Sequence, residues 1–113
     1  MGSYKGDEMM PYRNQKLRDF AKDAPHCMCC GEHNDGTVVG AHSNYLEDGK
    51  GMATKSNDLV ALLCCKCHSF IDGRDSDLTS LEKRMLFYRA WYRTSLWLLE
   101  TGRLVVGNPP YKD

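Results

Sequence analysis

The chain has 113 residues, of which 42% are hydrophobic and 27% charged, and this composition fits one compact domain with no room for a second. Fifteen basic residues balance fifteen acidic ones, so the net charge of zero argues against a protein that binds polyanions through bulk electrostatics alone. Because no run approaches the roughly 18 apolar residues of a membrane span and residues 1–16 lack the apolar region of a secretory signal, we expect a cytoplasmic protein without a membrane partner.

Residues 12–24 are predicted to form an N-terminal helix. Leu17, Phe20 and Ala21 recur there at helical spacing, and the other residues of the segment are mostly polar. Pro25 cannot continue a helix because it lacks a backbone N–H, so it marks the end of the segment. We expect this helix to pack as a lid on the remainder of the domain.

Two short strands separated by a polar loop are predicted next. Residues 37–42 contain a β-branched run, which indicates a strand that ends at His42. Residues 43–58 are polar and contain glycines, which favours a loop. Residues 59–63 are continuously apolar, as expected for a second, buried strand that leads directly into a cysteine cluster.

A long C-terminal helix is predicted over residues 79–102. Thr79 and Glu82 have the spacing of a capping box, and Gly102 is a typical C-terminal stop. Apolar residues cover more than one stripe of this helix, so we expect it to be largely buried or shared with a partner. The oligomeric state stays open, and this helix is the candidate surface for a homodimer. Residues 107–113 are expected to form a loose tail.

All six cysteines and all four histidines fall between residues 26 and 68. The pairs Cys27/Cys30 and Cys64/Cys67 have the C-x2-C spacing of zinc knuckles, and a reducing cytoplasm disfavours disulfides. We predict that these four thiolates bind one structural Zn²⁺ ion. Such a closed site stabilises the fold and does no chemistry. The alternative is a set of buried free thiols.

Two of the six cysteines are left over by this assignment. Cys29 could replace either ligand of the first pair, but we interpret Cys29 and Cys65 as packing cysteines. A redox sensor built on these two thiols is a minor alternative, because nothing marks either of them as activated. His26 and His33 are interpreted as structural residues.

The order of these features resembles the HNH endonucleases, which have a ββα-metal core with zinc knuckles. The residues that carry the resemblance are His42, Asn57, Asp58 and the run Cys64-x-x-Cys67-His68. With KLRDFAKDAPHC before the core, and AHSN and CHSFID within it, the chain resembles the small phage and prophage nuclease family typified by YbcO over about residues 15–75. The resemblance implies an α+β fold: a small zinc-stabilised, treble-clef-like ββα-metal core over residues 26–75, with flanking helices.

The resemblance also implies a metal-dependent endonuclease that hydrolyses DNA phosphodiester bonds, encoded by a phage or prophage and acting in the cytoplasm of the bacterial host. His42 matches the general base that activates water, and His68 matches the metal-ligating histidine at the end of the motif. Asp72 lies four residues after His68, and on this spacing alone we predict it as a second ligand for Mg²⁺ or another divalent ion.

Two positions depart from the HNH pattern. Ala41 stands where an acidic metal ligand usually precedes the base, and Leu59 stands where the central asparagine is expected. Either a shift of one residue brings Asp58 into the site as a metal ligand, or Asn57 orients the base; we favour Asp58, and Asn44 is a third candidate. Ala41 supports the alternative function, a zinc-stabilised module that binds nucleic acid or protein without catalysis.

Four basic residues are candidate contacts to DNA phosphates. Lys50 and Lys55 lie in the glycine-containing loop, which would project beside the active site. Arg89 and Arg93 lie on the long helix among aromatic residues, a mixture that suits phosphate contact and base stacking. The alternative for these two arginines is an ordinary solvated helix face.

Overall fold

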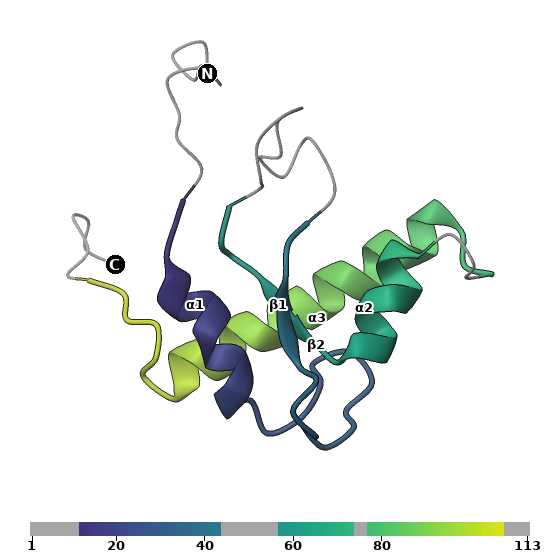
Figure 1. The fold of residues 1–113 in the computed structure, drawn as a ribbon. Helices are drawn as coiled ribbons and strands as arrows, with labels where there is room; N and C mark the ends of the chain where they lie inside the picture. Colours follow the sequence, from purple (N-terminus) through teal and green to yellow (C-terminus); the bar gives the residue numbers. More distant parts are fainter. Residues whose placement is uncertain (1–11, 44–56, 74–76, 108–113) are drawn as a thin grey trace, which may run out of the picture.

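A computed structural model describes residues 12–43, 57–73 and 77–107 of the chain (Figure 1). The elements in chain order are α1 (Gln15–Asp19), the 3-10 helix η2 (Phe20–Asp23), β1 (Val39–Ala41), β2 (Ala61–Leu63), α2 (Cys65–Asp72) and α3 (Ser80–Glu100). The two strands form an antiparallel sheet, with α1 on one side of it, α2 on the other and α3 crossing behind (Figure 1). This is a small α+β fold, as the family resemblance implied.

The N-terminal helix is shorter than the predicted range 12–24. The Asp58 N–H donates to the Tyr12 carbonyl oxygen at 2.8 Å, and the Asn14 N–H donates to Asp58 Oδ2 at 2.8 Å. These contacts hold the start of the segment in an extended conformation. Asn14 then caps α1, because its side chain accepts a hydrogen bond from the Lys16 N–H. The tertiary contacts to Asp58 therefore decide where the helix begins.

Strand β2 lies at the centre of the core, and all three of its residues are buried, as predicted. One neighbour is β1, with Val39 opposite Leu63. Toward the rest of the fold, the Leu62 N–H donates to Thr94 Oγ1 of α3 at 3.0 Å, and the Leu62 carbonyl accepts from the Met28 N–H at 2.9 Å. The buried N–H and carbonyl groups of Leu62 are thus hydrogen-bonded to α3 and to the turn between Cys27 and Cys30, which we call the first knuckle. These bonds hold both segments against the sheet.

Helix α1 approaches β1 closely at Gly40. A Cβ atom at this position would lie 3.1 Å from Val60 Cγ2 and 3.3 Å from Arg18 Cα, which is tighter than ordinary contact. Glycine therefore allows the close packing of α1 on the hairpin. The consequence is that Arg18 lies beside the strand end that precedes His42.

The long helix α3 has the ends that the sequence predicted. Both hydrogen bonds of the capping box are present, because the Glu82 N–H donates to Thr79 Oγ1 and the Thr79 N–H donates to Glu82 Oε1. Gly102 adopts a φ of +75°, a left-handed conformation that favours glycine and stops the helix. The buried side chains of α3 are Phe87, Ala90, Thr94 and Leu98.

Candidate functional site

The four predicted zinc ligands converge at one end of the hairpin. Cys27 and Cys30 come from the turn before β1, Cys64 follows β2, and Cys67 lies in the first turn of α2. Their four Sγ atoms lie within 4.8 Å of one another, and Cys30 Sγ is 3.9 Å from Cys64 Sγ. Zn–S bonds of about 2.3 Å in a tetrahedron place sulfur atoms about 3.8 Å apart, so the cluster fits a metal ion such as zinc.

Backbone N–H groups surround one of these sulfurs. Cys27 Sγ accepts hydrogen bonds from the N–H groups of Cys29, Cys30 and Cys64 at 3.3, 3.5 and 3.3 Å. Burial raises the pKa of the Cys27 thiol, but these N–H groups lower it more, to about 7. Burial and the neighbouring sulfurs raise the pKa of Cys67 far above its usual range. A bound cation would favour the thiolate forms of these cysteines.

The two remaining cysteines differ in their surroundings. Cys29 is partly buried and packs against the core, as expected. Cys65 is exposed, so its interpretation as a packing cysteine is wrong. Successive helix residues point about 100° apart. Because Cys67 of α2 faces the cluster, Cys65, two residues earlier, points away from it. His26 and His33 are exposed and pair in an isolated antiparallel bridge.

The opposite end of the hairpin carries a histidine–aspartate pair. His42 follows β1 directly, and Asp58 precedes β2. His42 Nε2 lies 2.8 Å from Asp58 Oδ1. The Asp58 side chain is fully buried, whereas 23% of the His42 side chain is exposed. One ring edge of His42 is thus held by a buried carboxylate, while the ring stays accessible from outside.

Two arginines share the same carboxylate. Arg13 Nη1 and Arg18 Nε lie 3.1 and 3.3 Å from Asp58 Oδ1. Burial raises the pKa of Asp58, but the His42 hydrogen bond, the Asn14 N–H and the two arginines lower it more, so the pKa lies below its usual value. Asp58 is therefore ionised at neutral pH despite its burial.

Sequence reasoning missed Arg13 and Arg18. The sequence feature that could have identified them is a pair of basic side chains, one before and one after the buried Leu17, in a segment predicted to cover the domain. That signal does not identify the carboxylate they meet, because Asp58 lies 45 residues after Arg13 in the chain.

Of the three candidates for the place of the central asparagine, Asp58 was predicted as a metal ligand and Asn57 as the residue that orients His42. Asp58 carries the described contact to His42, while Asn57 Oδ1 accepts a hydrogen bond from the Leu59 N–H at 2.9 Å. This bond forms a local turn that leads the chain into β2. Asn44 lies outside the described residues.

A second histidine–aspartate pair lies on α2. His68 Nε2 and Asp72 Oδ2 are 2.8 Å apart, and their side chains are 39% and 36% exposed. The pair shares one helix face, as its spacing of four residues predicted. His68 is thus paired with Asp72, and His42 with Asp58. Among the described residues, only the cysteine cluster brings together three or more metal-ligating side chains.

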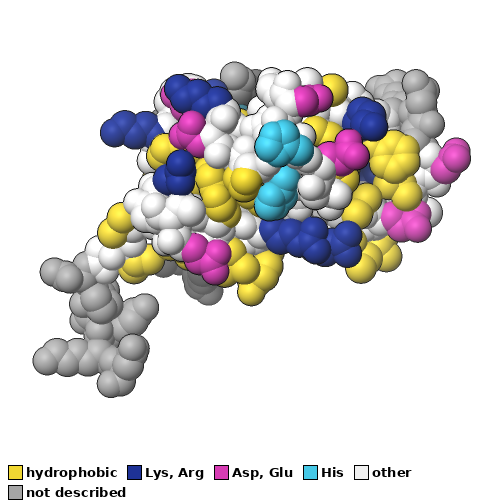
Figure 2. All heavy atoms as spheres, turned by 90° about the horizontal axis from the view of Figure 1, so that it is seen from below, with side chains coloured by type: hydrophobic (Ala, Val, Ile, Leu, Met, Phe, Trp, Pro, Cys, Tyr) yellow, Lys and Arg dark blue, Asp and Glu magenta, His cyan; other side chains and the backbone are white. Residues whose placement is uncertain are grey.

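The structure describes two of the four basic residues predicted to contact DNA. Lys50 and Lys55 lie outside the described residues. Arg89 and Arg93 are exposed on α3, and Arg93 Nη1 donates to the Met28 carbonyl of the first knuckle at 3.5 Å. Seen from below, basic side chains occupy several separate places on this face, and some of them lie beside histidine side chains (Figure 2).

Replacing Asp58 with asparagine is expected to lower the stability of the protein at pH 7 and to flatten its loss of stability in acid. Because the folded pKa of Asp58 is depressed, its contribution is complete above the unfolded value of about 3.9 and is lost as the pH falls through the folded value. Urea unfolding at pH 7 and through the acid range measures both effects. Asp19→Asn, at an exposed carboxylate, is the control, and parallel acid profiles for the parent and Asp58→Asn would contradict the prediction.

None of the helices in the described parts of the chain has the length and apolar character needed to cross a bilayer. The family model described as "Putative nuclease YbcO" matches residues 15–103, which is most of the chain. No curated protein and no solved structure gives a match. The chain therefore belongs to the YbcO family, whose description names a nuclease.

Proposed function

We propose that the chain is a metal-dependent endonuclease of the HNH type that hydrolyses DNA phosphodiester bonds in the cytoplasm of a bacterium carrying the phage or prophage. The observation that carries this proposal is the pair His42–Asp58, 2.8 Å apart at the end of a β-hairpin whose second strand leads into α2. The order β1, β2, α2 is that of a ββα core, and membership of a nuclease family supports the reaction class.

His42 would act as the general base. With Nε2 donating its proton to Asp58 Oδ1, Nδ1 keeps the lone pair that can take a proton from water. The ionised Asp58 carboxylate holds the ring in this tautomer and stabilises the imidazolium that forms. Arg13 and Arg18 keep Asp58 ionised, so they would position the base without touching the reacting atoms.

His68 and Asp72 would hold the catalytic ion. Two ligands at right angles and about 2.1 Å from an ion lie about 3 Å apart, which fits the separation of Nε2 and Oδ2. Magnesium commonly takes only one or two protein ligands and completes its shell with water and substrate phosphate, and a bound ion would stabilise the leaving oxyanion. The cysteine cluster would hold a separate, structural zinc ion.

DNA would be held through its phosphates. We propose Lys50, Lys55, Arg89 and Arg93 for these contacts. The exposure of the two arginines on α3 supports their part in this set.

The competing function is a zinc-stabilised module that binds nucleic acid or protein without cutting. The observation that favours it is Ala41, which is buried where an HNH enzyme usually has an acidic metal ligand. Residue 41 therefore adds no oxygen ligand to His68 and Asp72.

A nicking assay on supercoiled DNA separates the two functions. We expect nicking with Mg²⁺, Mn²⁺ or Ni²⁺ and none with EDTA. Zinc content is measured before and after the EDTA step, so that loss of the structural ion is distinguished from loss of the catalytic one. DNA binding without cleavage in every ion, by protein that keeps its zinc, would favour the binding module.

A further inference from the structure

Helix α3 carries a second apolar stripe, which we call the α3 stripe. Its side chains recur every three or four residues and are between 36% and 66% exposed. They are Leu81, Met85, Tyr88, Tyr92, Leu96 and Leu99. The buried side chains of α3 lie on another face, against the sheet. Such heptad spacing on an exposed face is typical of a helix that packs against another helix.

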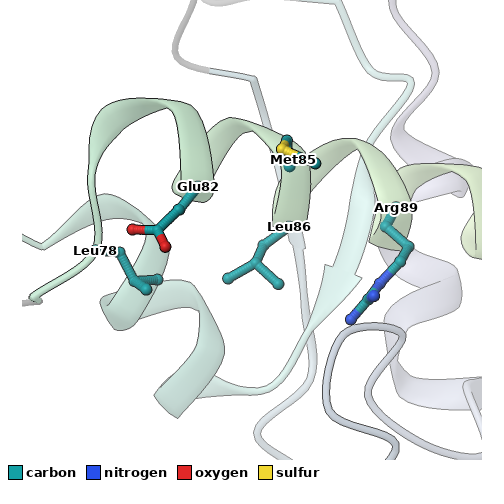
Figure 3. A pocket seen from close by; sticks show the side chains of 5 residues that line it. All are labelled: Leu78, Glu82, Met85, Leu86 and Arg89. Carbon is teal, nitrogen blue, oxygen red and sulfur yellow. The ribbon is translucent and has the colours of Figure 1, made fainter.

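A shallow pocket of about 290 Å³ runs along one flank of the α3 stripe. It is lined by Leu78, Glu82, Met85, Leu86 and Arg89. Glu82, Leu86 and Arg89 project from the same side of α3, with the two opposite charges at the ends of this row (Figure 3). Because Glu82 and Arg89 are seven residues apart, they occupy equivalent positions in successive heptads.

We propose that the part of the α3 stripe from Leu81 to Tyr92 is the interface between two copies of this chain, packed antiparallel along α3 about a two-fold axis. Leu81 of one copy then lies opposite Tyr92 of the second copy, and Met85 lies opposite Tyr88. In this register Glu82 of each copy meets Arg89 of the other, which gives two ion pairs by symmetry.

The charges beside the stripe select this register. Parallel packing would place Arg84 of one copy against Arg89 of the other. Antiparallel packing centred on residue 90 would place the two copies of Arg89 against each other. Only the proposed register pairs opposite charges along this flank. In this register Arg89 would pair with Glu82 in the dimer instead of contacting a phosphate, so the proposed phosphate contact on α3 would rest on Arg93 alone.

Sedimentation equilibrium of the full chain over a range of concentrations tests the interface. We expect a dimer for the parent and a monomer for Tyr92→Glu. Leu99→Glu is the matched control, because Leu99 belongs to the stripe but lies beyond the overlapping turns. A parent that stays monomeric at every concentration would overturn the proposal, as would equal effects of the two variants. Loss of DNA binding by Tyr92→Glu from a monomeric parent would assign the stripe to DNA instead.

Charge reversal tests the register. Arg89→Glu places two acidic groups together at each ion pair and should give a monomer, whereas the double variant Glu82→Lys/Arg89→Glu should restore the dimer. Glu82→Lys also removes half of the capping box, so circular dichroism must show that helix content is kept. A well-folded double variant that remains monomeric would exclude this register.

Discussion

His42→Ala is expected to slow metal-dependent strand cleavage by about a hundredfold to ten-thousandfold, the usual cost of removing a general base. Cleavage should fall because no other described group shares the position of His42 beside the buried carboxylate of Asp58. The fold and zinc content should survive, since His42 lies outside the cysteine cluster at the other end of the hairpin. Single-turnover nicking of supercoiled DNA at saturating metal measures the effect.

His33→Ala is the matched control for this variant. His33 is an exposed histidine beside the first knuckle, and its removal should leave the rate unchanged. His68→Ala should also stop cleavage, but by weakening metal binding, so high metal concentrations should restore part of the rate. If His42→Ala cuts DNA as fast as the parent, His42 is not the base.

The second large effect concerns zinc. We expect the purified protein to hold one tightly bound zinc ion and to unfold in part when the ion is removed, because structural zinc binding contributes apparent free energies of about 10–16 kcal/mol in zinc-finger peptides. Cys64→Ser should lose both the metal and most of the thermal stability. Elemental analysis after dialysis and thermal unfolding measure the two quantities.

Cys65→Ser provides the adjacent control. Cys65 has the same chemistry as Cys64 but is exposed and outside the cluster of four sulfurs, so its replacement should change little. Equal damage from the two variants would show that the ligand set is wrong. A zinc content near zero in folded, monodisperse parent protein would show that the fold does not depend on a bound zinc ion.

The proposed general base and the proposed zinc site lie at opposite ends of one small hairpin. The register of β1 with β2 puts Leu63 and the cysteine cluster at one end and His42 with Asp58 at the other. Losing zinc should therefore disturb the base indirectly, by loosening the strands, whereas His42→Ala should leave the metal in place. Measuring zinc content in every inactive variant separates these causes.

The sequence alone was sufficient where the controlling interactions are local. The C-x2-C spacing identified the two cysteine pairs that form the cluster, because each pair is closed by a single turn of backbone. The capping box of Thr79 with Glu82 and the stop at Gly102 were predicted for the same reason, since each depends on residues a few positions apart. The pairing of His68 with Asp72 likewise follows from helical spacing.

Tertiary structure decided what depends on residues far apart in the chain. Asp58 draws Tyr12 and Asn14 into an extended segment, which shortens the predicted helix and brings Arg13 and Arg18 to a buried carboxylate. No local pattern contains that contact, because it is made by packing α1 against the end of the hairpin. The same holds for α3: its sequence shows apolar residues on more than one stripe, but only packing against β2 decides which stripe is buried and which stays exposed.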